Sequence, residues 1–154
     1  MFCNTAGEQR VMLIQSIIRA LDRLSPAKQR AAHLYTGERG EEAAYFHLRR
    51  LGYVMVARNY RSPRRRGEID LIGWDKDELC VIEVKTKSSK DFIPAEVAVD
   101  AEKQHDLRDV AREYLRKVPG QPTTRFDIVS VYFSEAGAEF ELFKNAFSVS
   151  EQYF

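Results

Sequence analysis

An alternation of apolar and polar residues predicts a β-hairpin between residues 67 and 85. Two runs rich in Ile, Leu and Val, Glu68–Trp74 and Leu79–Thr86, flank the charged segment Asp75–Glu78. Two such runs around a short polar segment are typical of paired antiparallel strands. Side chains alternate between the faces of a strand, so Glu83 and Lys85 are expected on the same face.

The length of the turn decides which residue faces Glu83. A turn of two residues (Lys76 and Asp77) or of four places Asp70 directly opposite Glu83, with Cβ atoms roughly 5 Å apart. A turn of three residues puts the two carboxylates on opposite faces, unless a bulge restores the register. Two of these three turn lengths therefore bring the carboxylates together.

Helical patterns lie on both sides of the hairpin. Ser25-Pro26 predicts the start of a helix that runs toward Arg50, and Gly52 is placed to end it. Gly37 and Gly40 are points at which this helix could be interrupted. Its apolar stripe consists of Ala44, Tyr45, Leu48 and Leu51. A second helix is expected from Asp100 to about Lys117, stopped by Pro119-Gly120, with Leu107, Val110, Ala111, Tyr114 and Leu115 on its core side.

Three further strands complete an α/β sheet of about five strands. They are expected at Tyr53–Ala57, Arg125–Phe133 and Phe140–Phe143, with Arg58–Arg66 as a loop before the hairpin. Asp127 interrupts an apolar run, and we interpret it as a structural or sheet-edge residue.

Length and composition favour one domain. The 154 residues are 44% hydrophobic, enough for a single core. We assign residues 26–154 to this domain and residues 1–25 to an N-terminal extension with a short amphipathic helix. The two cysteines, Cys3 and Cys80, suggest neither a disulfide framework nor a zinc site. No apolar run is long enough to span a membrane, so we expect a soluble cytoplasmic protein without a membrane partner.

The paired carboxylates have two interpretations. On a solvated hairpin face, Glu and Lys alternate for solubility and cross-strand pairing. Asp70 weighs against this reading, because Asp is unfavourable inside a strand. The alternative is a metal site, since two adjacent carboxylates repel unless a cation lies between them. Oxygen ligands without nearby His or Cys favour Mg²⁺ or Mn²⁺, and Lys85 is placed to orient water or stabilise charge on a phosphate.

The basic residues near the hairpin also have two interpretations, as a solvated surface or as a phosphate-binding patch. The net charge is only +1, with 24 basic and 23 acidic residues, so phosphate binding would need a local patch. The expected arginine loop could be a solvated surface or could contact phosphate. The candidates for phosphate contact are Arg58, Arg61, Arg64, Arg65, Arg66, Lys85, Lys87 and Lys90. Lys103 and Gln104 are weaker candidates at the start of the second helix, and Glu41 on the first helix reads as a solvated residue.

The ordered set of segments resembles the YraN-like family of small bacterial proteins and, more broadly, the PD-(D/E)xK nuclease superfamily. The matching residues are Gly40-Glu41 with Ala44 and Leu48, Gly52-Tyr53, Asn59, Arg61, Gly67–Ile72, Glu83–Lys85, Lys103, Arg125–Asp127 and Asn145–Phe147. Ile69 stands where the superfamily motif has Pro, which supplies no ligand, and Lys87 stands where relatives often have Arg.

This resemblance implies a fold, a site and an activity. The fold is restriction-endonuclease-like, with three layers and a central mixed sheet flanked by helices. Asp70 and Glu83 hold the metal, Glu41 supports it and Lys85 serves the attacking water, in a nuclease acting on DNA rather than RNA, such as branched or structured DNA. Branched-DNA nucleases of this fold commonly dimerise, so by analogy a homodimer is expected. The alternative from another class is a catalytically silent nucleic-acid-binding or partner-scaffolding domain of the same fold, and a third is a purely structural protein.

Overall fold

The computed structural model describes residues 26–87 and 99–148, with side chains from Thr36 onward. The chain divides into units of residues 1–36 and 37–154, and the architecture below is that of the second unit. The helix expected within residues 1–25, the loop at Ser88–Pro94 and Lys90 lie outside the described residues. The elements are α2 (Pro26–Arg50), β1 (Val54–Arg61), β2 (Glu68–Asp75), β3 (Glu78–Lys87), α4 (Ala101–Leu115), β4 (Thr124–Ser134) and β5 (Gly137–Phe147).

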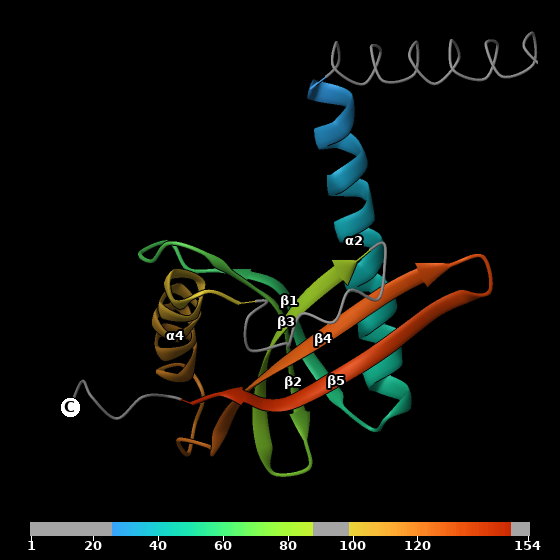
Figure 1. The fold of residues 1–154 in the computed structure, drawn as a ribbon. Coiled ribbons are helices and arrows are strands. Elements are labelled where there is room, and N and C mark those ends of the chain that lie inside the picture. The colour runs from blue at the N-terminus through green and yellow to red at the C-terminus, as the bar shows by residue number, and fades with distance from the viewer. Residues whose placement is uncertain (1–25, 88–98, 149–154) are drawn as a thin grey trace, which may run out of the picture. The chain divides into compact units, whose positions relative to one another are not determined.

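The strands form one mixed sheet in the order β1-β2-β3-β4-β5 (Figure 1). β3 and β4 are parallel, and the other neighbouring pairs are antiparallel. A parallel pair needs a crossover connection, and the chain between β3 and β4 contains α4. The prediction of about five strands is confirmed.

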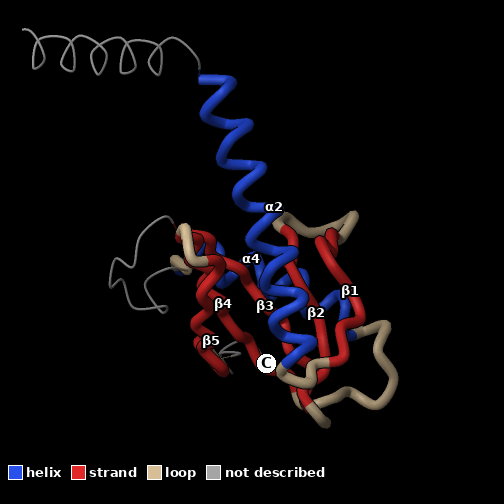
Figure 2. The backbone as a smooth tube through the Cα atoms, turned by 90° about the vertical axis from the view of Figure 1, so that its right-hand side faces the viewer, coloured by secondary structure: helices blue, strands red, loops and turns tan. Residues whose placement is uncertain are grey.

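The two helices cover opposite faces of the sheet, which gives three layers (Figure 2). On one face, Ala44 and Leu48 of α2 join a buried cluster with residues of β2, β3 and β4. On the other face, Leu107, Val110 and Ala111 of α4 are the centre of a second buried cluster. Most of the apolar positions predicted for the two helices therefore face the core. The prediction was wrong for Leu51, which lies beyond the end of α2 and is 53% exposed. None of the helices in the described residues is both long and apolar enough to cross a membrane.

The ends of the helices follow the predicted signals. Pro26 is the first residue of α2. After Arg50, the Gly52 backbone is left-handed (φ 97°), and the Tyr53 N–H donates to the Leu48 carbonyl at 3.1 Å, as in a Schellman motif. Asp100 caps α4, since its carboxylate accepts a hydrogen bond of 2.8 Å from the Lys103 N–H.

The glycine at position 40 does not interrupt α2 and instead allows close packing. A Cβ atom at Gly40 would lie 1.8 Å from Oγ1 of Thr86 on β3. Only a residue without a side chain permits this approach of helix and strand. It brings α2 against the end of β3, beside Lys85.

The β2–β3 hairpin has the two-residue turn, one of the predicted lengths, but the strand pairing stops one residue short of Asp70 and Glu83. Asp75 pairs with Glu78 across Lys76 and Asp77, and the register runs on to Leu71 opposite Ile82. Beyond that point the two strands separate. β3 continues beside β4 as far as Lys87, whereas β2 continues beside β1 as far as Glu68. The separation leaves room for polar side chains inside the sheet.

The expected boundary between the first strand and the arginine loop was wrong. β1 extends to Arg61, so Arg58 and Arg61 are strand residues. The register with β2 shifts between Met55 and Ala57, and Asn59 has a left-handed backbone (φ 47°). These two irregularities break the alternation of apolar residues that would identify the strand from sequence. β5 is likewise longer than expected.

Asp127 is structural, and the sheet-edge interpretation was wrong because β4 has a neighbour on each side. Its buried carboxylate accepts hydrogen bonds from Arg125 Nε (3.0 Å) and the Asn145 N–H (2.9 Å). Arg125 also contacts Asp75 and Glu78, and so it connects β4 with both strands of the hairpin. This buried network closes the end of the sheet at the hairpin turn.

Candidate metal centre

Three carboxylates from two elements gather where β2 and β3 separate. One carboxylate oxygen each of Glu41, Glu68 and Asp70 lies within 4.8 Å of the other two. Glu41 comes from α2, and the other two residues come from β2. Like charges at this separation repel, and a cation or a proton among them would relieve the repulsion.

Asp70 is the most buried member of the cluster, with 7% of its surface exposed. Its Oδ2 accepts a hydrogen bond of 2.7 Å from the Val84 N–H, a donor left free by the separation of the strands. Burial, and after it the nearby charge of Glu83, raises the pKa of Asp70 from 3.8 to about 7, although the Val84 hydrogen bond acts in the opposite direction. The carboxyl group therefore titrates near neutral pH.

Glu83 lies beside this cluster and faces two ammonium groups. Its Oε1 is 3.0 Å from Lys85 Nζ, and its Oε2 is 3.3 Å from Lys103 Nζ. The second contact is close enough for an ion pair but lacks hydrogen-bond geometry, so this buried oxygen has no hydrogen-bond partner. Both lysines contact Glu83, whereas Asp70 has no cation in direct contact among the described residues. The nearby charge of Lys103 still acts to lower the pKa of Asp70.

Glu41 is fixed by an asparagine of β1. The Asn59 side-chain amide donates a hydrogen bond of 2.6 Å to Glu41 Oε2. The neighbours of Asn59 in β1 pair with Leu71 and Ile69 of β2. Asn59 therefore lies opposite Asp70 in the register. Asn tolerates the left-handed conformation seen here better than most residues. Glu41 therefore reaches the strands and is more than a solvated helix residue.

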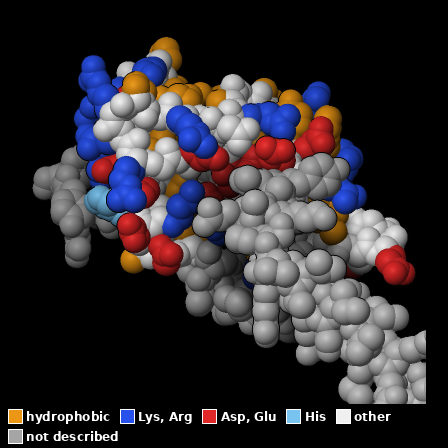
Figure 3. Space-filling model, turned by 90° about the horizontal axis from the view of Figure 1, so that it is seen from above, with side chains coloured by type: hydrophobic (Ala, Val, Ile, Leu, Met, Phe, Trp, Pro, Cys, Tyr) orange, Lys and Arg blue, Asp and Glu red, His pale blue; other side chains and the backbone are white. Residues whose placement is uncertain are grey.

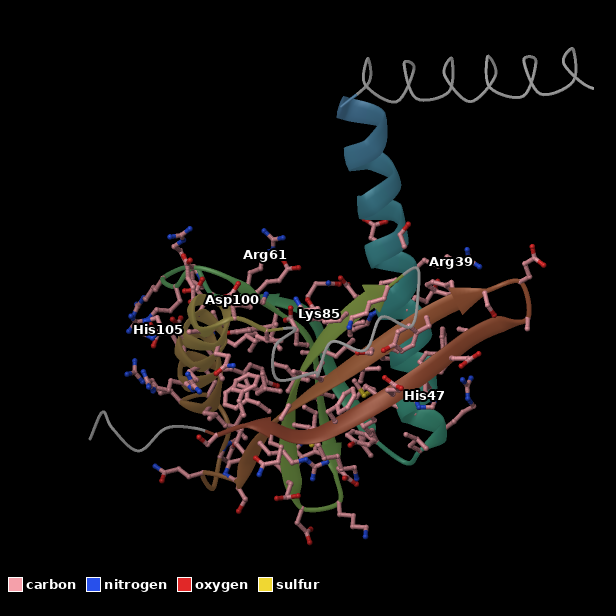
Figure 4. All side chains as sticks on the ribbon, in the orientation of Figure 1. Arg39, His47, Arg61, Lys85, Asp100 and His105 are labelled. Carbon is pink, nitrogen blue, oxygen red and sulfur yellow. The ribbon has the colours of Figure 1, made fainter. Side chains whose placement is uncertain are left out.

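The predicted phosphate-contact residues divide into paired and unpaired groups. Arg61 contacts Glu68, Arg65 Nη1 lies 3.7 Å from Asp109, and Lys103 faces Glu83. Three others form no ion pair within the described part of the chain: Arg64, Arg66 and Lys87. Figure 4 places Arg61 and Lys85 at the same end of the sheet, opposite the hairpin turn. Figure 3, which views this end, shows acidic side chains near the middle with Lys and Arg side chains around them.

Sequence reasoning missed Glu68 and Asn59 as members of the site. Glu68 is two residues before Asp70, a spacing that places both on one face of a regular strand, and this signal could have identified it. Asn59 is among the residues that match the family, but strand periodicity gave no signal for it because its position depends on the irregular backbone of β1. His105, which was not expected to bind metal, is exposed and lies 3.7 Å from Asp109.

The donor set fits a hard divalent cation. The cluster offers carboxylate oxygens and no thiol or imidazole, which suits Mg²⁺ or Mn²⁺ and disfavours zinc. The site has four carboxylates and three cations. The carboxylates are those of Glu41, Glu68, Asp70 and Glu83, and the cations are Arg61, Lys85 and Lys103. The site is short of one positive charge. The pKa of Asp70 is raised first by burial and then by the charge of Glu83.

A five-stranded mixed sheet between two helices is consistent with the three-layer restriction-endonuclease-like architecture, here with a candidate metal centre where two strands part. The chain belongs to the family described as "Uncharacterised protein family UPF0102", whose model matches residues 40–131. The matched region contains Glu41, Asp70 and Glu83. This result confirms the resemblance to the YraN-like family.

Relatives in the same family cover most of the chain. A UPF0102 protein of Koribacter versatilis is 49% identical over 136 residues, spanning 88% of this chain and 95% of the relative. A UPF0102 protein of Solibacter usitatus is 45% identical over 136 residues, which is 88% of this chain and all of the relative. One from Porphyromonas gingivalis is 39% identical over 108 residues, covering 70% of this chain and 78% of the relative.

Proposed function

We propose that this protein is a Mg²⁺- or Mn²⁺-dependent nuclease of the PD-(D/E)xK superfamily that hydrolyses phosphodiester bonds in DNA. The observation that supports it best is the cluster of Glu41, Glu68 and Asp70, whose negative charge is incompletely balanced. The Arg125 network has the same net charge, but each of its carboxylates contacts a cation directly. Asp70, in contrast, contacts no cation among the described residues. A site that lacks one cation is suited to bind one.

Each residue has a chemical role in this proposal. Asp70 and Glu83 hold the cation with Glu41, and Glu68 adds a carboxylate that the sequence did not suggest. The cation supplies Lewis-acid activation of the phosphate and of water. Lys85 is 3.0 Å from Glu83, and its ammonium is placed to orient water and to stabilise the charge that develops on the phosphate.

The substrate is held by the cations around the cluster. Arg61 contacts Glu68, so a bound phosphate would compete for a guanidinium that already lies at the site. Arg64 and Arg66 are exposed and lie between β1 and β2, near the same end of the sheet. Such contacts position a nucleic-acid backbone without reading its sequence. DNA is favoured over RNA only by the superfamily resemblance, which also suggests a homodimer. The cytoplasm is the expected setting because the two cysteines suggest no disulfide framework.

Cleavage assays test the proposal directly. The purified protein is incubated with branched, nicked and single-stranded DNA, with Mn²⁺ or with EDTA. We expect cleavage only with the metal, and its loss in Asp70→Ala and Glu83→Ala. Asp77→Asn, which changes an exposed carboxylate in the hairpin turn, is the matched control and should keep activity. Cleavage that persists in Asp70→Ala would refute the site.

One observation favours a silent binding domain as the second candidate. Lys85 and Lys103 already neutralise Glu83, which is the arrangement of a stable ion-pair network. This candidate predicts salt-sensitive DNA binding that neither needs metal nor leads to cleavage. A purely structural role predicts that neither Mn²⁺ nor DNA changes the thermal stability.

A further inference from the structure

A surface of aromatic and cationic side chains lies one helical turn from the acidic cluster. We define it by Tyr45, Phe46, Arg49 and Arg58. Tyr45 follows Glu41 by four residues on α2, so it lies on the same side of the helix, roughly 6 Å along the axis. Arg58 directly precedes Asn59, whose amide binds Glu41. The surface is therefore continuous with the candidate metal centre.

The Tyr45 ring holds two guanidinium groups. Cζ of Arg58 lies 4.9 Å from the ring centroid and Cζ of Arg49 lies 5.8 Å from it, both within the range of cation–π attraction. Neither arginine forms an ion pair with any carboxylate in the portion of the chain that the structure describes. In contrast, Arg61 and Arg125 contact acidic side chains. Arg49 and Arg58 thus present uncompensated positive charge in fixed positions.

Phe46 adds an exposed aromatic ring to this surface. It is 46% exposed, and its ring meets the Tyr45 ring edge-on, with centroids 5.3 Å apart. An exposed aromatic ring beside unpaired guanidinium groups matches a ligand that has both flat rings and negative charge. Single-stranded nucleic acid has both, whereas the bases of a duplex are already stacked on one another.

We propose that this surface binds a single-stranded stretch of the nucleic-acid substrate, with a base stacked on Phe46 and phosphates bound by Arg49 and Arg58. Tyr45 is a positioning residue that orients the two guanidinium groups. The inference rests on the proposed function and deepens it: the preferred substrate has an unpaired strand next to the bond that is cleaved. A second copy of the chain or an acidic peptide would not require the exposed ring of Phe46.

Binding is measured without metal, so that it does not depend on cleavage. The full chain in EDTA is titrated against a labelled oligothymidylate and a duplex of the same length, and anisotropy is followed over a range of salt concentrations. We expect Phe46→Leu, which keeps an apolar side chain, to weaken single-strand binding about tenfold and to leave duplex binding unchanged. Arg49→Gln and Arg58→Gln should each lower the salt slope by about 0.7.

Two controls separate specific contacts from general charge and from folding. Arg116→Gln removes an exposed charge at the end of α4, on the other face of the sheet, and should bind like the wild type. Tyr45→Phe keeps the ring and should retain the salt slope, whereas Tyr45→Leu should lower it. Urea midpoints establish that each variant is folded.

The outcomes distinguish this inference from the proposed nuclease function. Wild-type affinity in Phe46→Leu, an equal loss for duplex, or no binding of the oligonucleotide by the wild type at low salt would overturn the inference. Metal-dependent cleavage could still occur in those cases, and it is measured separately with Mn²⁺. If the variants lose binding while the wild type never cleaves, the nuclease proposal fails and the single-strand surface stands.

Discussion

Asp70→Asn should stabilise the metal-free protein at alkaline pH. Burial and Glu83 raise the pKa of Asp70 from 3.8 to about 7, so the folded state binds this proton more tightly than the unfolded state. The stabilising contribution of the proton is complete below pH 3.8 and disappears as the pH rises to 7. One pKa unit corresponds to about 1.4 kcal/mol, which makes the charged form unfavourable by on the order of 4 kcal/mol above pH 7.

The asparagine variant removes this charge and keeps the local geometry. Its amide oxygen can accept the hydrogen bond that Asp70 Oδ2 accepts from the Val84 N–H. The pH range over which the two pKa values differ, from 3.8 to about 7, spans roughly three pH units. About two of these units lie between pH 5 and pH 7. The free energy of unfolding of the variant, relative to the wild type, should therefore be higher at pH 8 than at pH 5 by on the order of 3 kcal/mol.

Urea unfolding in EDTA at pH 5 and pH 8 measures this difference. Adding Mn²⁺ at pH 8 should then stabilise the wild type by mass action, and should stabilise Asp70→Asn much less. Asp127→Asn is the matched control, since Asp127 is also a buried aspartate but is paired with Arg125. It should be destabilised at both pH values, because Arg125 loses its buried partner. The reasoning would be refuted if Asp70→Asn showed the same pH dependence as the wild type.

Three further predictions concern other parts of the structure. Glu68→Gln should weaken Mn²⁺ binding about tenfold or more with little change in the urea midpoint, and calorimetric titration measures it. Arg125→Met should lower the free energy of unfolding by about 3–5 kcal/mol, because Asp127 stays buried without its cation; a neutral result would mean that the network is dispensable. Gly40→Ala should lower the free energy of unfolding by about 1–3 kcal/mol through a clash with Thr86, and Thr86→Ala should restore part of it.

Local signals in the sequence were sufficient for most of the fold. Pro26, Gly52 and Asp100 act within one helical turn, so the ends of α2 and α4 could be predicted. The hairpin register follows from a two-residue turn and the alternation around it. β1 could not be delimited, because its shifted register and the left-handed Asn59 remove the alternation on which such a prediction depends.

The sequence by itself determined the five-strand α/β architecture, most of the two core-facing helix stripes and the two-residue hairpin turn, because each depends on periodicity or on a short turn. Only the tertiary structure decided how the site is composed. It ends the pairing of β2 with β3 at Leu71, so that residues 68–70 of β2 are not paired with β3 and the Val84 N–H is available to Asp70. It also brings Glu41 and Glu68 into the cluster and assigns both lysines to Glu83. Whether a buried carboxylate is neutralised depends on every charge around it, and those charges come from elements far apart in the chain.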